Sequence, residues 1–244
     1  MSISIYAINL DRSAERWSAL SESAGALGLP LVRVPGVDGT KTPAEERIDC
    51  DARAFSRNNG RTILPGEYGC YRSHLKALAA FLETGEPAAV IVEDDIVLTA
   101  DLLDRAAAAI EALPAADVIK LFNHRIVGFR RRTVTRAGDE LGRTTHGPQG
   151  SAACYAVTRA GAAKLLASLA IMEFPWDIAL ERGWSTGASI YTTCRDVAAP
   201  KRDSTTIATR AAYRAAKFPW WRRLRTYCIR IIETARRIAY ALGR

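Results

Sequence analysis

The sequence predicts an α/β fold with a mostly parallel sheet flanked by helices. Short apolar runs alternate with longer stretches of helical periodicity, in the order strand, helix, strand, helix, strand. That order is typical of parallel sheets, because a helix returns the chain to the starting edge before the next strand begins. The chain has 244 residues, 48% of them hydrophobic, so it is long enough and apolar enough to bury a full core.

The first elements are the clearest. Residues 3–10 form an apolar run that stops at a polar cluster, as an opening buried strand does. A helix is expected next, with Ser13 as its N-cap and Gly28 at its end. The segment 31–39 then indicates a second strand that runs into a turn.

Strands and helices continue to alternate towards residue 200. Apolar residues at helical spacing predict an amphipathic helix between residues 64 and 85. Strands are expected at 88–92, 117–122, 151–158 and 189–194, and helices at 100–113 and 159–170. The composition then changes, so we divide the chain into a globular domain at 1–205 and a tail at 206–244.

Positive charge is concentrated in the tail. The chain has a net charge of +8, but residues 201–244 hold 12 Lys and Arg against two acidic residues, whereas residues 1–200 hold 22 against 24. The basic character therefore belongs to the tail and not to the domain.

The tail has the pattern of a basic amphipathic helix that begins near Pro219. Arginines lie between apolar residues that recur every three or four positions, namely Trp220, Trp221, Leu224, Cys228, Ile231, Ile232, Ala235, Ile238, Ala239 and Leu242. Such a helix with interfacial tryptophans is expected to lie on an anionic membrane surface. The alternatives are packing on its own domain, a dimer contact, and nucleic-acid binding. The single apolar stripe favours lipid, so no nucleic acid is expected as a partner.

Cysteine usage and hydropathy indicate a cytoplasmic protein. The five cysteines are widely spread without a C-x-x-C pair, as is typical of reduced cytosolic thiols. No basic segment precedes the first apolar stretch, and no apolar run approaches the roughly 20 residues that span a bilayer. We therefore expect peripheral attachment to the cytoplasmic face of the inner membrane.

Three adjacent carboxylates, Glu93, Asp94 and Asp95, follow the predicted strand at 88–92. Ligands of open α/β sheets bind at the carboxyl ends of strands. Like charges repel unless a cation compensates, and carboxylate oxygens suit Mg²⁺ or Mn²⁺. Because alternate side chains of a strand share a face, Glu93 and Asp95 are expected to point together and Asp94 away. A solvated acidic turn or a helix N-terminus would also explain the cluster.

Five segments, in order, resemble the successive motifs of the family-25 glycosyltransferases, which include lipopolysaccharide and lipooligosaccharide galactosyltransferases and collagen galactosyltransferases. The segments are YAINLDRSAER (6–16), VPGVDG (34–39), LPGEYGCYRSH (64–74), VIVEDDIVL (90–98) and ACYAVTRAGAAKLL (153–166). The resemblance implies a nucleotide-sugar transferase of the A-type fold. It also implies an acid-x-acid motif that holds the diphosphate of a UDP-sugar through Mn²⁺ or Mg²⁺.

The resemblance further implies roles for individual side chains. Asp95 would be the direct ligand of the metal motif Glu93, Asp94 and Asp95, and Glu93 would act through the ribose or a metal-bound water. The donor-binding residues implied are Asn9, Asp11, Arg12, Arg16, Asp38, Ser73 and His74. The alternatives are a plain helix start with surface arginines and a structural histidine. Cys70 and His74 offer two metal ligands without further partners, so we expect no metal site there.

Asp177, in EFPWDIAL, matches a Pro-x-Asp element that precedes the last helix of the family. An inverting transferase needs a carboxylate that takes the proton of the acceptor hydroxyl, and Asp177 is our candidate. The alternative is that Asp177 caps the following helix. A late polar loop with Lys201, Asp203 and Ser204 has no assigned role.

The sequence thus predicts a metal-dependent glycosyltransferase that moves a sugar, expected to be galactose, from a UDP-sugar to a glycan or lipid-linked oligosaccharide such as the lipopolysaccharide core. Two alternatives stay open. One is a catalytically silent, membrane-associated relative. The other is a metal-dependent phosphotransferase or phosphohydrolase, which would need a nucleophilic aspartate motif that we do not find.

Overall fold

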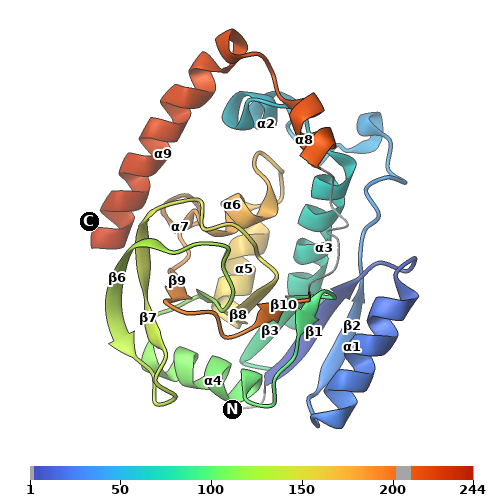
Figure 1. The fold of residues 1–244 in the computed structure, drawn as a ribbon, viewed down its shortest axis with the longest axis vertical. Helices are drawn as coiled ribbons and strands as arrows, with labels where there is room; N and C mark the ends of the chain where they lie inside the picture. Colours follow the sequence, from blue (N-terminus) through green and yellow to red (C-terminus); the bar gives the residue numbers. More distant parts are fainter. Residues whose placement is uncertain (1–2, 202–209, 244) are drawn as a thin grey trace.

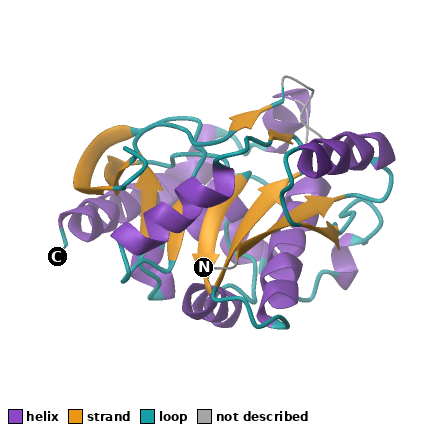
Figure 2. Ribbon diagram, turned by 90° about the horizontal axis from the view of Figure 1, so that it is seen from below, coloured by secondary structure: helices purple, strands orange, loops and turns teal. Residues whose placement is uncertain are grey.

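The computed structural model describes residues 3–201 and 210–243 and builds most of them around one eight-stranded sheet (Figures 1 and 2). Helices cover both faces of the sheet, which confirms the α/β class. In their order across the sheet, the strands are β2 (Leu31–Pro35), β1 (Ile3–Asn9), β3 (Ala88–Glu93), β8 (Cys154–Thr158), β5 (Val118–Lys120), β9 (Ile190–Thr193), β7 (Glu140–His146) and β6 (Val127–Val134).

The sheet is mixed. β1 is parallel to β2 and β3, and β5 is parallel to β9, as the alternation of strands and helices predicts. β8 runs antiparallel between β3 and β5, and β7 pairs antiparallel with both β9 and β6. The sequence did not reveal the β6–β7 hairpin, because β6 is mostly exposed and rich in arginine and so lacks the apolar alternation of a strand.

Two hydrophobic cores lie on the two faces of the sheet. Helices α1 (Ala14–Ala26) and α4 (Leu102–Ala112) pack on one face, and α3 (Pro65–Leu82), α5 (Arg159–Ser168) and α6 (Trp176–Leu180) pack on the other. Side chains of β3 alternate between them: Ile91 lies in the core with α3, whereas Val90 and Val92 lie in the core with α1 and α4. The position of a residue along β3 therefore decides which helices it meets.

A second, two-stranded sheet brings the late part of the chain beside the carboxylate cluster. β4 (Ile96–Val97) pairs antiparallel with β10 (Ala199–Pro200). The backbone N–H of Lys201 donates to the carbonyl oxygen of Asp95 at 2.6 Å. Lys201 thus lies next to the cluster, whereas Asp203 and Ser204 of the same loop are outside the described residues.

The described residues form further helices. They are η1 (Ala44–Glu46), α2 (Ala52–Asn59), α7 (Gly183–Thr186), α8 (Arg210–Ala216), η2 (Trp220–Arg223) and the C-terminal α9 (Leu224–Leu242). The division that we expected between residues 205 and 206 falls in the segment 202–209, which the structure does not describe. No helix in the parts of the chain that are described is long and apolar enough to cross a bilayer.

Helix α9 packs on its own domain, beside β7 (Figure 1), and it does so through its polar side. The hydroxyl of Thr226 donates to the carbonyl of Arg57 at 2.8 Å. The hydroxyl of Tyr240 accepts the N–H of Ile190 at 2.6 Å and donates to the carbonyl of Ala188 at 2.8 Å. These contacts hold the start of α9 against α2 and its C-terminal end against β7 and β9.

The apolar stripe of the tail faces away from the domain. The exposed fractions are 63% for Trp220, 60% for Trp221, 57% for Leu224 and 71% for Ile231. Helix packing on the domain therefore leaves these residues uncovered. We call the surface formed by Trp220, Trp221, Leu224, Cys228 and Ile231 the outer face.

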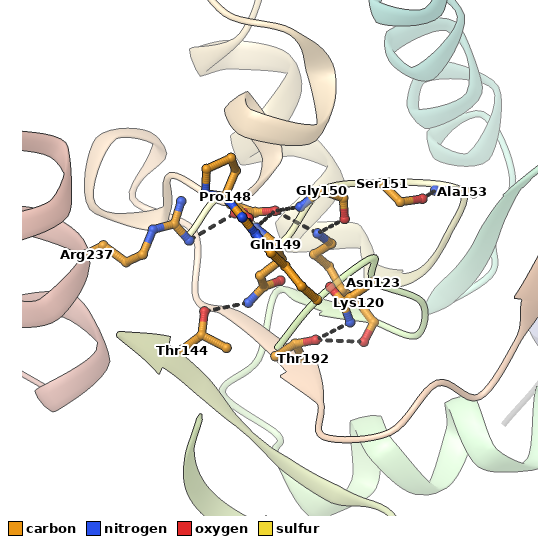
Figure 3. Close-up of polar contacts among 12 residues, drawn as sticks. Lys120, Asn123, Thr144, Pro148, Gln149, Gly150, Ser151, Ala153, Thr192 and Arg237 are labelled. Atoms are coloured by element: carbon orange, nitrogen blue, oxygen red, sulfur yellow. Dashed lines mark hydrogen bonds and ion pairs between the residues drawn. The ribbon is translucent and has the colours of Figure 1, made fainter. Parts of the chain in front are cut away.

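A buried charge network joins α9 to the sheet (Figure 3). Arg237 of α9 donates to Glu181 at 2.9 Å, and Lys120 of β5 donates to the same carboxylate at 2.8 Å. The backbone N–H groups of Gln149 and Gly150 also donate to Glu181, at 3.0 and 3.2 Å. Burial by itself raises the pKa of Glu181, but Lys120 and Arg237 outweigh it and leave the pKa lowered. Glu181 is thus ionised and depends on both cations.

Replacing Arg237 by Met is expected to lower the free energy of unfolding by about 3 kcal/mol, because it leaves the buried, ionised carboxylate of Glu181 with one cation, Lys120, in place of two. Arg236→Met is the matched control: Arg236 is adjacent on α9, but its side chain is 58% exposed and its pair with Glu233 is worth at most about 1 kcal/mol. Urea unfolding of both variants measures the difference. Equal midpoints would show that the network does not stabilise the docked helix.

Candidate functional site

The three carboxylates at the end of β3 point to different helices. Glu93 follows the alternation of Ile91 towards α3, and its Oε1 lies 3.4 Å from Nε2 of His74. Asp94 turns to the other face and meets Arg16 of α1 at 3.3 Å. Asp95 returns to the side of Glu93, and both line the same cavity. Glu93 and Asp95 thus share one cavity, as the alternation predicts, but Asp94 lines the first cavity together with Glu93, and both aspartates lie in the turn after β3.

Asp94 is held by fixed partners. Besides the ion pair with Arg16, its Oδ2 accepts the side-chain N–H of Asn9 at 2.7 Å. Asn9 is itself buried, and its Oδ1 accepts both Nε and Nη2 of Arg33. Asn9, Arg16 and Asp94 therefore form a polar bridge between β1, α1 and β3 that supports the end of the strand.

Asp95 carries an oxygen that the protein leaves unsatisfied. Its Oδ1 is buried and has no hydrogen-bond partner among residues 3–201 and 210–243. Burial, together with the negative charges of Glu93 and Asp94, raises the pKa of Asp95 to about 6. An unpaired, desolvated carboxylate beside two others is a costly arrangement unless a cation compensates it. Glu93 and Asp95 thus supply carboxylate oxygens, negative charge and one oxygen without a hydrogen-bond partner, and these features fit a divalent cation.

Two cavities meet at this point. The first has a volume of about 70 Å³ and the second about 400 Å³, and Cys70 and Glu93 line both, so they form the wall between them. The first cavity is also lined by Ile8, Leu10, Arg12, Val37, Asp38, Gly39, Gly66, Ser73, His74 and Asp94. The second is also lined by Glu67, Asp95, Phe122, His124, Ser151, Ala152, Ala153, Pro175, Trp176, Asp177, Pro200 and Tyr213.

Arg12 and Asp38 form an ion pair at the first cavity. The bond from Arg12, with those from Thr40, lowers the pKa of Asp38 to about 2. The loop that carries Asp38 lies directly on α3: a Cβ at Gly39 or at Gly69 would collide with the backbone of the other segment. Glycine is therefore required at both positions for this close approach.

Ser73 and His74 also reach the first cavity, each with a further structural contact. The hydroxyl of Ser73 accepts the backbone N–H of Val37 at 2.8 Å and so holds the loop against α3. His74 is fully buried, its ring stacks on Trp176 with centroids 4.9 Å apart, and its Nδ1 lies 3.2 Å from the hydroxyl of Tyr155.

The structure does not bring all predicted donor-binding residues together. Arg12, Asp38, Ser73 and His74 line the first cavity, whereas Asn9, Asp11 and Arg16 do not. The side chain of Asp11 is 78% exposed and pairs with Arg33 at 2.9 Å. Asp11 therefore points to solvent beside β2. Asn9 and Arg16 do not line the first cavity but bind the carboxylate of Asp94.

Asp177 lies in the second cavity, which it shares with Asp95. It is the second residue of α6, whose N-cap position is Pro175, so Asp177 does not cap the helix from outside as the alternative interpretation required. Burial and the charge of Glu181 raise the pKa of Asp177 to about 6, although Lys120 opposes them. A carboxylate with this pKa is poised to accept a proton near neutral pH.

Several residues around the second cavity were missed by sequence reasoning. Glu67 is buried and paired with Arg61, and Tyr213 of α8 completes the lining. Lys120 and Glu181 lie behind Asp177 as a buried pair. A lysine inside the apolar segment 117–122 was a usable signal, because a charge in a buried strand needs a partner. Nothing local marked Tyr213, which reaches the cavity from beyond residue 209.

Comparison with known proteins finds a family of similar sequences. The family model described as "Glycosyltransferase family 25 (LPS biosynthesis protein)" matches residues 2–180, from β1 through α6, and so includes the carboxylates of β3 and Asp177. A curated relative from Anopheles gambiae, named "Glycosyltransferase 25 family member", is 29% identical over 96 residues, which are 38% of this chain. The match spans only 16% of the length of that relative.

Proposed function

The chain belongs to glycosyltransferase family 25, and on this premise we propose that it transfers a hexose, galactose in the first instance, from a UDP-sugar to a glycan acceptor. The observation that carries the proposal is the wall between the two cavities. There Glu93 and Asp95 end a buried strand, and an unsatisfied oxygen of Asp95 lies in the same cavity as Asp177. Metal ligands for a donor and a base for an acceptor are thus side by side.

We place the diphosphate of the donor, and not the whole nucleotide, at the first cavity and its wall, because a volume of about 70 Å³ is too small for a nucleotide. Glu93 and Asp95 would hold Mn²⁺ or Mg²⁺. Asp94 is bound by Asn9 and Arg16, so its role would be to support the end of the strand and not to ligate the metal. When bound, the cation offsets the negative charge that develops on the departing diphosphate. Arg12 lies at the mouth of the first cavity with a side chain that is 47% exposed, and its guanidinium suits phosphate oxygens.

The second cavity suits the acceptor. Asp177 would take the proton of the attacking hydroxyl, which is the role of the base in an inverting transferase. Tyr213, which lines the same cavity, offers apolar surface for a sugar ring. The acceptor we propose is a lipid-linked oligosaccharide of the lipopolysaccharide-core class, because the outer face of α9 offers attachment to the surface where such a substrate lies.

We propose that this outer face binds the anionic, cytoplasmic surface of a membrane. Its exposed tryptophans and Ile231 are surrounded by the exposed arginines 222, 225, 230 and 236, and this is the composition of interfacial helices. Because the polar side of α9 already contacts the domain, lipid binding needs no undocking of the helix. Attachment would thus leave the active site unchanged.

Replacing Trp221 and Ile231 together by Ser is expected to release the protein from vesicles that contain anionic lipid, while soluble-substrate turnover stays within about twofold, because neither side chain is part of the cavities. Co-sedimentation at low and moderate salt measures binding. The control is Ile48→Ser, a 90% exposed apolar residue outside the tail. Equal sedimentation of the parent and the double variant would contradict membrane binding by this face.

Calorimetric titration with UDP, with and without Mn²⁺, tests the proposed function directly. A metal-dependent transferase should bind UDP tightly only with the cation, and a screen of UDP-sugars should then show metal-dependent hydrolysis of one of them. A catalytically silent relative should show no metal-dependent binding, and a phosphohydrolase should release phosphate without transferring a sugar. Either result would replace our proposal by that alternative.

A further inference from the structure

The wall between the two cavities contains a second group of metal ligands. Cys70 and His74 are one turn apart on the same side of α3, and Glu93 approaches them from the end of β3. Their ligand atoms, a thiol sulfur, an imidazole nitrogen and a carboxylate oxygen, all lie within 4.8 Å of one another. We propose that Cys70, His74 and Glu93 form a binding site for a thiophilic divalent cation of the zinc class, separate from Asp95 but sharing Glu93 with it.

The imidazole of His74 is oriented for this role. Its Nδ1 lies 3.2 Å from the hydroxyl of Tyr155, its ring is fixed by stacking on Trp176, and its Nε2 points to Glu93 at 3.4 Å. Metal-bound histidines are commonly held by a hydrogen bond to the second ring nitrogen, which sets the tautomer and the ring orientation. Because His74 is completely buried, little side-chain entropy remains to be lost on binding.

The chemistry of the ligands selects a different cation from the one at Asp95. Thiolate and imidazole suit Zn²⁺, whereas Mg²⁺ and Mn²⁺ prefer oxygen. Cys70 is surrounded by carboxylates, and burial together with Glu93, Asp177 and Glu67 raises the pKa of its thiol well above the usual value. A cysteine binds a metal ion as the thiolate, so Cys70 gives up its proton when a cation binds. The same carboxylates supply the negative field that attracts the cation.

Three protein ligands leave one position of a tetrahedral zinc ion open. Because Cys70 and Glu93 line both cavities, that position is accessible from them. If the proposed function holds, an ion at this place withdraws Glu93 from the donor-binding cation and narrows the first cavity. Zinc should accordingly inhibit transfer that Mn²⁺ supports.

The test uses the full chain, reduced and without nucleotide or sugar, titrated with Co²⁺ as a spectroscopic substitute for zinc. The parent should develop a thiolate-to-cobalt charge-transfer band with tetrahedral d–d bands, and Zn²⁺ should displace it. Cys70→Ser should lose the band and bind Zn²⁺ at least about tenfold more weakly in competition with a chromophoric chelator. Cys194→Ser is the control: its thiol is half-buried, lies outside both cavities, and its removal should change nothing.

Glu93→Gln provides a second variant that keeps every thiol, and it should weaken zinc binding and alter the d–d bands while the charge-transfer band persists. A parent without a charge-transfer band, or a Cys70→Ser variant whose band equals that of the parent, would overturn the site. Thermal melting of the variants confirms that they are folded. Failure of the proposed function appears instead as the absence of Mn²⁺-dependent UDP binding in the parent, so the two failures are distinguishable.

Discussion

Asp95→Asn is expected to abolish metal-dependent binding of UDP, with a loss of affinity of about 10²-fold or more, because compensation of phosphate charge by a cation is worth several kcal/mol. The substitution conserves size and removes the charge of Asp95, which is the one carboxylate in the described parts of the chain with a buried oxygen that has no hydrogen-bond partner. The diphosphate would then face Glu93 and Asp94 without compensation. Titration calorimetry with and without Mn²⁺ measures the effect.

The same variant should be folded and more stable than the parent in the presence of a chelator. The pKa of Asp95 is raised to about 6, above its value in the unfolded chain, so its contribution to stability is present at low pH and is lost as pH rises through 6. At pH 7 the ionised side chain therefore destabilises the fold, by about 3 kcal/mol at most, because the pKa rises from 3.8 to about 6 and each pKa unit corresponds to about 1.4 kcal/mol. Asn removes this cost.

Asp94→Asn is the matched control for Asp95→Asn. It removes the charge that pairs with Arg16 and should lower the melting temperature, but metal-dependent UDP binding should persist because the carboxylate of Asp94 is already engaged by Asn9 and Arg16. If Asp95→Asn binds UDP like the parent, or if Asp94→Asn is the more severe of the two in binding, the assignment of metal ligands is wrong.

Asp177→Asn is expected to lower the rate of transfer by about 10²- to 10⁴-fold and to leave UDP affinity unchanged, because a general base contributes only in the transition state. Asp177 lines the second cavity and not the first, so removal of its charge should not reach the nucleotide. Single-turnover transfer and UDP titration on one preparation separate the two effects. Transfer within tenfold of the parent would show that the base lies elsewhere.

The pH profile adds an independent check on Asp177. Burial and Glu181 raise its pKa to about 6, Lys120 lowers it, and Glu67 raises it. Because a base must be ionised, kcat/KM of the parent should fall as pH drops below about 6. The residual activity of Asp177→Asn should lack that limb. An unchanged limb in the variant would assign the titration to another group.

Local sequence pattern was sufficient for the elements that frame the site. The apolar run before Glu93 and the helical spacing around His74 were strong signals of secondary structure. Both elements bury a whole face, and the residues of a buried face recur in the sequence with the period of the element. The same period predicted that Asp95 would share a cavity with Glu93, but not that Asp94 would also line the first cavity with Glu93. The β6–β7 hairpin was not predicted. Its outer strand, β6, is mostly exposed and therefore lacks the alternation of apolar and polar residues that indicates a strand.

Tertiary structure alone decided which side chains meet. Sequence reasoning treated Asn9, Asp11 and Arg16 as one group with Arg12, since all follow the first strand, but only Arg12 reaches the first cavity. Their directions depend on how α1 and β2 pack beside β1. A segment of sequence records whether a residue is buried, but not which partner from another segment will face it.

The sequence by itself determined the α/β class, the place of the acidic motif at a strand end, and an amphipathic basic helix at the C-terminus. It did not determine that Glu93 would join Cys70 and His74, or that Arg237 would reach Glu181 from α9. The physical reason is that periodicity is a property of one element and is fixed by its own backbone geometry. Proximity between elements instead depends on how the helices pack on the twisted sheet. The packing of the whole core determines that arrangement.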